Sequence, residues 1–130
     1  MCLRINTAIH KKLYKEYIPI KIKENLEVYK CVKADWDEKV ITRVWSPMQS
    51  FVYDINKEYC TKLGIVHKEV NEGFHSYLNK SFAICNSLYG LNCNTIATCI
   101  IPKGSKIFIS YNFIEIVSNK IRIIGIERTC

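Results

Sequence analysis

The C-terminal part of the chain constrains the fold most, because β-branched runs alternate there with turn residues. The runs are Cys93–Ile101, Lys106–Asn112 and Asn119–Glu127, and they are separated by Pro102-Lys103-Gly104-Ser105 and by Val117-Ser118. β-Branched residues favour extended backbone, whereas proline and glycine favour turns. The pattern predicts an antiparallel meander over this part of the chain.

Two further runs of strand formers lie upstream. Leu26–Lys33 and Lys39–Trp45 flank the acidic segment Ala34–Glu38, which predicts a hairpin with its turn in that segment. Ser46-Pro47 ends the second run, because proline cannot donate to a β-ladder. A short strand is expected near Ser50–Tyr53, and the residues 54–72 have no defined pattern.

One segment has the features of a helix. Residues 79–90 begin with two alternative caps, Asn79 and Ser81, and end at a glycine. The apolar positions Phe82, Cys85 and Tyr89 share one helical face. We therefore expect a helix of two to three turns.

The first 25 residues carry two conflicting signals. Ile9, Leu13 and Tyr17 recur at helical spacing, whereas Pro19 and the alternating isoleucines of 18–22 indicate extended backbone. A short N-terminal helix or coil leading into a strand is the expectation. The lysines of this segment are read as a solvated face, or alternatively as an arm that attracts anions.

Together these elements predict the α+β class, with a mainly antiparallel curved β-sheet and one main helix, because helices and strands do not alternate regularly. The 130 residues contain no repeat, linker or low-complexity tract, so residues 1–130 are expected to form a single domain. No apolar run approaches the ~20 residues that span a bilayer. We expect a soluble, cytoplasmic protein with no membrane contact.

Charge and cysteine content narrow the classes of partner. The net charge of +7 comes from 19 Lys and Arg against 12 Asp and Glu, and lysine predominates. Lysine attracts anions but lacks the planar guanidinium with which arginine binds phosphates and bases through two hydrogen bonds. A general positive surface charge is therefore favoured over a protein that recognises bases in a nucleic-acid groove. The seven cysteines are odd in number and have neither a Cys-x-x-Cys pair nor zinc-binding spacing, so reduced thiols and no metal or cofactor are expected.

Reactive groups converge at Gly73-Phe74-His75-Ser76-Tyr77. On an extended chain His75 and Tyr77 point to one face, where an imidazole and a phenol could orient a ligand or move a proton. The alternative is structural, with Tyr77 packed and His75 bonded to a carbonyl. No nucleophile is tied to this pair by a motif, so no catalytic residue is assigned.

Basic and aromatic residues supply further candidates for ligand binding. Lys103 and Ser105 in the turn could meet a phosphate, although a hairpin turn explains them equally. Lys120 and Arg122 fall on one face of the last strand, or simply form its exposed side. Tyr111 or Tyr77 beside Arg122 could stack on a base. No duplex-reading motif is visible, so nucleic acid is a less favoured partner.

The segments Met1-Cys2-Leu3, Val28-Tyr29-Lys30, Ser46-Pro47, Gly73–Tyr77 and Ile101–Lys106 occur in an order that resembles a group of small uncharacterised proteins of phages and low-GC bacteria. The resemblance covers most of the chain and carries no catalytic residues. Small phage accessory proteins of this type often act by binding, as inhibitors of host immune nucleases or as sponges for nucleotide signals. The resemblance therefore implies a phage counter-defence setting.

The leading functional prediction is a non-enzymatic protein that sequesters a small anionic nucleotide. Its ligand-binding residues would be His75, Tyr77, Lys103, Ser105, Tyr111, Lys120 and Arg122. The alternative is a protein-binding inhibitor of a host immune nuclease or CRISPR effector. A further alternative is an NAD-using, ADP-ribosyltransferase-like enzyme with Glu115 beside His75 and Tyr77. An exposed edge of the final strand could also pair two copies as a homodimer.

Overall fold

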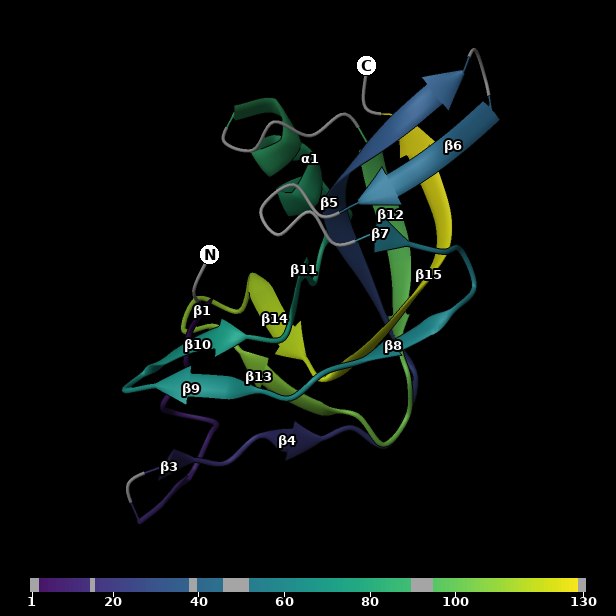
Figure 1. The fold of residues 1–130 in the computed structure, drawn as a ribbon. Helices are drawn as coiled ribbons and strands as arrows, with labels where there is room; N and C mark the ends of the chain where they lie inside the picture. Colours follow the sequence, from purple (N-terminus) through teal and green to yellow (C-terminus); the bar gives the residue numbers. More distant parts are fainter. Residues whose placement is uncertain (1–2, 15, 38–39, 46–51, 90–94, 129–130) are drawn as a thin grey trace.

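The computed structural model describes residues 3–14, 16–37, 40–45, 52–89 and 95–128 (Figure 1). One helix lies among many antiparallel strands, so the predicted α+β class is confirmed. In chain order the elements are β1 (Leu3–Arg4), β2 (Lys12–Leu13), β3 (Glu16–Tyr17), β4 (Ile20–Lys21), β5 (Leu26–Asp37), β6 (Val40–Trp45), β7 (Val52–Tyr53), β8 (Glu58–Cys60), β9 (Gly64–Val66), β10 (Glu69–Glu72), β11 (Phe74–Tyr77), α1 (Lys80–Tyr89), β12 (Thr95–Ile101), β13 (Lys106–Ile109), β14 (Glu115–Ser118) and β15 (Lys120–Arg128).

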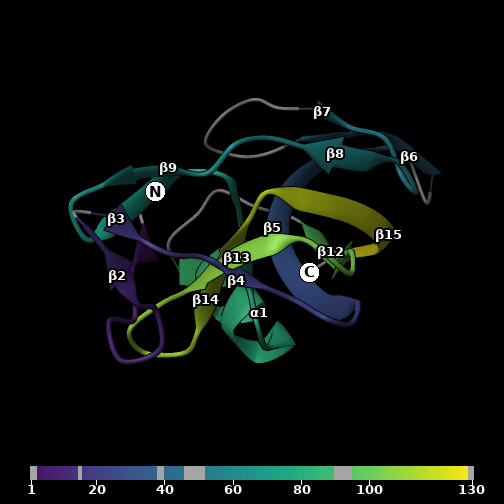
Figure 2. The same cartoon turned by 90° about the horizontal axis from the view of Figure 1, so that it is seen from below.

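The main sheet curls round on itself. Its strand order is β4-β13-β14-β11-β5-β12-β15-β8, with β6 paired to β5 and β7 paired to β6. Three strands separate β14 from β15 in that order, which in a flat sheet would place them about 19 Å apart. Only Asn119 separates them in the chain, and so short a link spans about 7 Å at most. The sheet therefore bends until β14 and β15 meet at a corner (Figure 2).

Asn119 holds this corner through both its backbone and its side chain. Its Oδ1 accepts from the amide of Lys106 at 2.9 Å, and its own amide donates to the carbonyl of Lys106 at 3.1 Å. Its carbonyl accepts from the amide of Thr61 at 2.8 Å. One residue thus joins β13, β14, β15 and the start of the loop after β8.

The concave side of the sheet encloses the largest core. Alternate residues of β12 and β15 point into it, since side chains alternate between the faces of a strand. Its buried members are Val28, Val32, Tyr53, Phe74, Ala97, Cys99, Ile101, Ile107, Ile116, Ile121 and Ile123. Burying this apolar set supplies the main driving force for closing the sheet.

Two covers lie on the convex side. The three-stranded sheet β1-β10-β9 packs over β13 and β14 through Leu3, Val70, Phe108 and Val117. The helix α1 packs through Ala83 against a cluster that includes Cys31, Tyr77 and Ile96. The outer face of β11 lies where these two covers approach each other.

The helix was predicted at the right place but on the wrong face. Asn79 is the cap, because its Oδ1 accepts from the amide of Ser81 at 2.9 Å. Ala83 faces the sheet and is fully buried, whereas Phe82 and Cys85 are exposed. The small side chain of Ala83 lets the helix backbone approach β5, where the thiol of Cys31 donates to its carbonyl at 2.8 Å. The side chain of Tyr89 and Gly90 lie outside the described residues.

The predicted hairpin of β5 and β6 is confirmed, with one correction. Residues 34–37 of the expected acidic turn continue β5, because β5 pairs with β6 as far as Asp37↔Val40. Glu38 and Lys39 are not described, nor is the predicted stop at Ser46-Pro47. The expected short strand after it is found as β7.

The predicted C-terminal meander is wrong. β13 pairs with β14, but β12 and β15 pair with each other, and Val117 and Ser118 belong to β14 instead of a turn. The Pro102–Ser105 turn bonds to Ile22, not across a hairpin, so the strands on its two sides diverge. Residues 54–72, left without a pattern, form β8, β9 and β10.

The N-terminal segment contains no helix within its described residues. β2 and β3 instead pair as a small hairpin in the register Lys12↔Tyr17 and Leu13↔Glu16, and Tyr14, in the turn after β2, has a φ of 57°. The spacing of Ile9, Leu13 and Tyr17 therefore does not report a helical face. The hairpin projects beyond the curled sheet at the lower left of Figure 1, and β4 leads from it to the main sheet.

Candidate functional site

The predicted pair His75 and Tyr77 lies on β11. This strand pairs with β14 in the register His75↔Val117 and Tyr77↔Glu115. Opposed residues of paired strands share a face, as do alternate residues of one strand. His75, Tyr77 and Glu115 therefore project from the same side of the sheet, and Ser76 points to the other side, where it is buried.

His75 is a half-buried, neutral imidazole whose two ring nitrogens are shielded from solvent. Burial, with the Lys30 ammonium as the second cause, lowers the pKa of His75 to about 4. Neither ring nitrogen has a hydrogen-bond partner in the described part of the chain. Unpartnered buried nitrogens are rare in proteins and are often found where a water or a ligand binds.

Lys30 occupies the gap where β5 and β11 part. The two strands pair only at Tyr29↔Tyr77. Lys30 is 8% exposed, and its Nζ donates to the carbonyl of His75 at 2.6 Å. The ammonium thus takes the place of the backbone donor that a continuing strand would have supplied.

His75, Tyr77 and Glu115, on the outer face of β11 and β14, carry groups that can transfer protons. In this structure, however, a substrate has no open path to the His75 nitrogens or to Tyr77. Burial raises the pKa of Glu115, so this carboxyl and the neutral imidazole of His75 could exchange a proton. The nitrogens of His75 have no contact with solvent, and Tyr77 is almost fully buried. A substrate could reach the Tyr77 side chain only if its packing against Ala83 of α1 opened.

The turn at Pro102–Ser105 has no free backbone N–H for a phosphate, because the amides of Lys103, Gly104 and Ser105 are all engaged. The amide of Lys103 donates to Oδ1 of Asn25 at 2.8 Å, that of Gly104 to the carbonyl of Ile22 at 2.9 Å, and that of Ser105 to the carbonyl of Pro102 at 3.1 Å. Ser105 is fully buried and its hydroxyl donates to Pro102 at 2.6 Å. The structure argues against Ser105 as a ligand contact, and leaves only the exposed side chain of Lys103.

Lys120 and Arg122 share the outer face of β15, as the alternation with the buried Ile121 and Ile123 requires. The surroundings of Arg122 are not those of an anion site. Glu58 lies directly opposite Arg122 on β8, and Glu27 lies beyond Ile100 on the other side. The Nε of Arg122 is buried without a partner among the described residues. Two carboxylates in the same row would oppose a phosphate there.

Tyr111 is not beside Arg122. It follows β13 at the end of that strand opposite to Asn119, the residue from which β15 starts. Its ring is 61% exposed and lies under the guanidinium of Arg4, at 5.6 Å from Arg4 Cζ to the ring centroid. Tyr77 is not beside Arg122 either, because it lies on β11 and is buried in the cluster that contains Ala83 of α1. The seven predicted ligand-binding residues therefore occupy four separate places.

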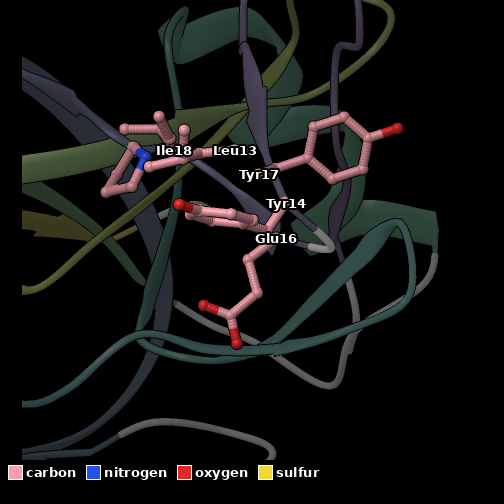
Figure 3. Close-up of a pocket in the computed structure, with 6 residues that line it drawn as sticks. Leu13, Tyr14, Glu16, Tyr17 and Ile18 are labelled. Carbon is pink, nitrogen blue, oxygen red and sulfur yellow. The ribbon is translucent and has the colours of Figure 1, made fainter.

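A surface that the sequence analysis missed lies on the hairpin of β2 and β3. Its three apolar side chains, called here the hairpin patch, are Leu13, Tyr14 and Ile18, exposed by 58%, 93% and 42%. They line an open pocket of about 590 Å³ together with Glu16, Tyr17 and Pro19. Figure 3 shows the Tyr14 ring between the Leu13 and Ile18 side chains and that of Glu16, with the Tyr17 ring directed away.

Lysines close in the sequence give the hairpin patch a positively charged surround. Lys11, Lys12 and Lys21 are exposed around it, and Lys12 lies over the ring of Tyr17 at 5.6 Å. Tyr14 has a positive φ, which is uncommon for a bulky residue and is shared in the described residues by Asn56, His67 and Phe113. The sequence does contain a signal for this surface, namely the Leu13-Tyr14 pair within a run of lysines. The helical spacing of Ile9, Leu13 and Tyr17 favoured a helix instead and so hid that signal.

The hairpin is fixed to the sheet by His10. The ring Nδ1 contacts the carbonyl of Ile18 at 3.0 Å, and Nε2 accepts from the amide of Ile109 at 3.0 Å. These two contacts require the tautomer with its proton on Nδ1. His10 is buried and its ring lies against that of Phe108, with the centroids 4.9 Å apart and the planes tilted by 44°. The backbone at Ile18, where the hairpin returns to the sheet, is therefore anchored to β13.

Comparison of the chain with protein-family models, with curated proteins and with solved structures finds no match. Within the described ranges no helix is long and apolar enough to cross a membrane. In the same ranges, no three His, Cys, Asp or Glu side chains gather in a group that could hold a metal ion.

Proposed function

We propose that this protein acts by stoichiometric binding to another protein, which it contacts through the hairpin patch. The observation that carries the proposal is the exposure of Leu13, Tyr14 and Ile18 on a projecting hairpin. A tyrosine beside aliphatic residues is typical of the anchor of a protein interface, because it contributes large contact area at a small entropy cost. The contacts of His10 hold the hairpin to the sheet in the free protein, so less conformational entropy would be lost when a partner binds, and the affinity would be higher.

This reading is preferred to nucleotide sequestration, which stays a prediction. A nucleotide site built from the seven predicted residues would need their cations and a stacking ring around one cavity. Arg122 lies on β15 whereas Tyr111 lies in the turn after β13, the hydroxyl of Ser105 is engaged, and Glu58 and Glu27 lie in the same row as Arg122. Enzyme chemistry at His75 would need a movement that opens the site.

The partner is proposed to be a host defence protein, such as an immune nuclease or a CRISPR effector. This setting rests on the resemblance to small phage proteins, and the mode of action is occlusion of the partner's functional surface. A second copy of the chain is disfavoured as the occupant of the hairpin patch, since Lys11, Lys12 and Lys21 would meet their own charge across a two-fold axis.

The test uses paired variants with matched chemistry. L13S/Y14S removes an aliphatic and an aromatic side chain from the hairpin patch, and V66S/Y111S removes the same two kinds from other exposed positions. Immobilised protein is exposed to a lysate of the bacterial host, and the affinity of any captured protein is then measured after purification. We expect at least about a 30-fold loss for L13S/Y14S and little change for V66S/Y111S.

Equal capture by both variants would contradict the proposal. So would a ligand-specific rise in melting temperature with linear or cyclic nucleotides, combined with no effect of L13S/Y14S on host proteins. That second result would restore nucleotide sequestration as the leading function.

A further inference from the structure

A ribbon of two paired segments next to the hairpin carries four exposed lysines. Residues 20–25 lie antiparallel to residues 102–107, in the register Ile20↔Ile107 and Lys21↔Lys106. Farther along, the amide of Ile22 donates to the carbonyl of Ser105 at 3.0 Å. The exposed lysines, called here the lysine ribbon, are Lys21, Lys23, Lys103 and Lys106.

The lysine ribbon has an uncompensated charge. Glu24 is the one acidic residue in these two segments, so four lysines less one glutamate leave a charge of +3. The ion pair found among the described residues, between Lys80 and Glu127, lies elsewhere. Lys21 directly opposes Lys106 across the strand pair, an arrangement that destabilises a sheet unless a counter-charge is present.

Protection of a sheet edge explains only part of this arrangement. β4 is the terminal strand of the main sheet, and a lysine on an edge strand discourages pairing with other chains. Lys21 fits that role. Lys106 does not, because β13 is paired on both sides, with β4 and with β14.

We propose that the lysine ribbon binds a cluster of carboxylates on the same protein partner that the hairpin patch contacts, so that this partner has an acidic surface beside an apolar groove. The inference rests on the proposed function. Continuity supports it, because Pro19 in the wall of the pocket leads directly into β4. Lysines present point charges that suit dispersed carboxylates, and no exposed ring for base stacking lies within the two segments.

The probe is a fluorescently labelled polyglutamate peptide of about 15 residues, with anisotropy as the readout. K21Q/K106Q removes the opposed pair, and K62Q/K68Q removes the same charge from exposed lysines elsewhere. We expect K21Q/K106Q to bind roughly five- to tenfold more weakly than the parent and K62Q/K68Q to bind nearly as well. Higher salt should weaken the parent far more than K21Q/K106Q.

Equal losses in the two double variants would overturn the inference, because they would show a response to net charge alone. Tighter binding of a thymidine oligonucleotide of equal charge, lost in K21Q/K106Q, would also overturn it in favour of nucleic acid. L13S/Y14S should retain polyglutamate binding. Failure of the hairpin patch and failure of the lysine ribbon are therefore separable, since each is removed by its own variant.

Discussion

At the scale of single residues, His10 determines where the hairpin sits. It is buried, and its two ring nitrogens contact Ile18 on the hairpin and Ile109 on β13. Nothing in the sequence around His10 distinguishes it from an exposed histidine, since its two partners lie 8 and 99 positions away. By contrast, the shared face of His75 and Tyr77 follows from strand alternation alone and was predicted.

Replacement of His10 by alanine should loosen the hairpin. It leaves the amide of Ile109 and the carbonyl of Ile18 without their partners, which should lower the free energy of unfolding by roughly 2 kcal/mol. Urea denaturation measures that loss, and hydrogen exchange should show faster exchange in the hairpin. His67→Asn, at an exposed position with positive φ, serves as the control and should change neither. Unchanged exchange in the His10 variant would mean that other contacts hold the hairpin.

His75 should make the protein less stable in mild acid. The unfolded chain takes up a proton near the ordinary pKa of 6.5, whereas burial holds the pKa of folded His75 at about 4. Stability is therefore full above about pH 6.5 and falls as the pH drops toward 4, by up to about 3 kcal/mol. Denaturation of the parent and of His75→Asn across this range should show a smaller decline in the variant. Parallel curves would contradict a half-buried, neutral imidazole.

Glu115 should act with the opposite sign. Burial raises the pKa of this carboxyl above its ordinary 4.5, so its charge disfavours the folded state and that penalty disappears as the pH falls. Glu115→Gln should therefore stabilise the protein slightly at neutral pH. Loss of stability in Glu115→Gln at pH 7 would indicate a favourable partner for the carboxylate.

At the scale of elements, long and well-marked segments were predictable and short ones were not. The pairing of β5 with β6 follows from two long runs of strand formers, and the position of α1 follows from its cap. Strands of two to four residues, such as β2 or β10, are too short to show a period. The buried face of α1 was missed because the residue packed against the sheet is the small Ala83 instead of a large apolar side chain.

The cap of α1 can be tested by two neighbouring substitutions. Asn79→Ala removes the oxygen that accepts from the amide of Ser81 and should destabilise the protein by about 1 kcal/mol. Ser81→Ala leaves that bond intact and should have an effect within about 0.5 kcal/mol of zero. Urea denaturation of both variants measures the difference. A larger loss in Ser81→Ala would assign the cap to the other candidate.

At the scale of the whole molecule, the path of the sheet depends on contacts between distant segments. β12 pairs with β5 and β15 instead of its neighbour β13, and the corner at Asn119 brings β14 and β15 together. The local sequence pattern does not determine these pairings, because the alternation of apolar and polar residues in a strand is the same whichever strand it pairs with. For the same reason the seven predicted ligand-binding residues could be named one by one, but their separation could not be foreseen.

The whole-molecule arrangement also sets the hairpin apart from the sheet. The hairpin extends beyond the curled sheet, joined to it by β4 and held by His10 (Figure 1). A projecting element whose apolar side chains face solvent suits contact with a large partner better than enclosure of a small ligand.

Site-specific photocrosslinking tests whether a protein partner binds at the hairpin patch. The photoreactive residue p-benzoyl-phenylalanine is placed at position 14 in one protein and at position 111 in another, since both tyrosines are exposed. After irradiation in host cells, mass spectrometry identifies the crosslinked proteins. We predict one recurrent host protein joined at position 14 and not at position 111. The same adducts at both positions, or none at position 14, would contradict the account.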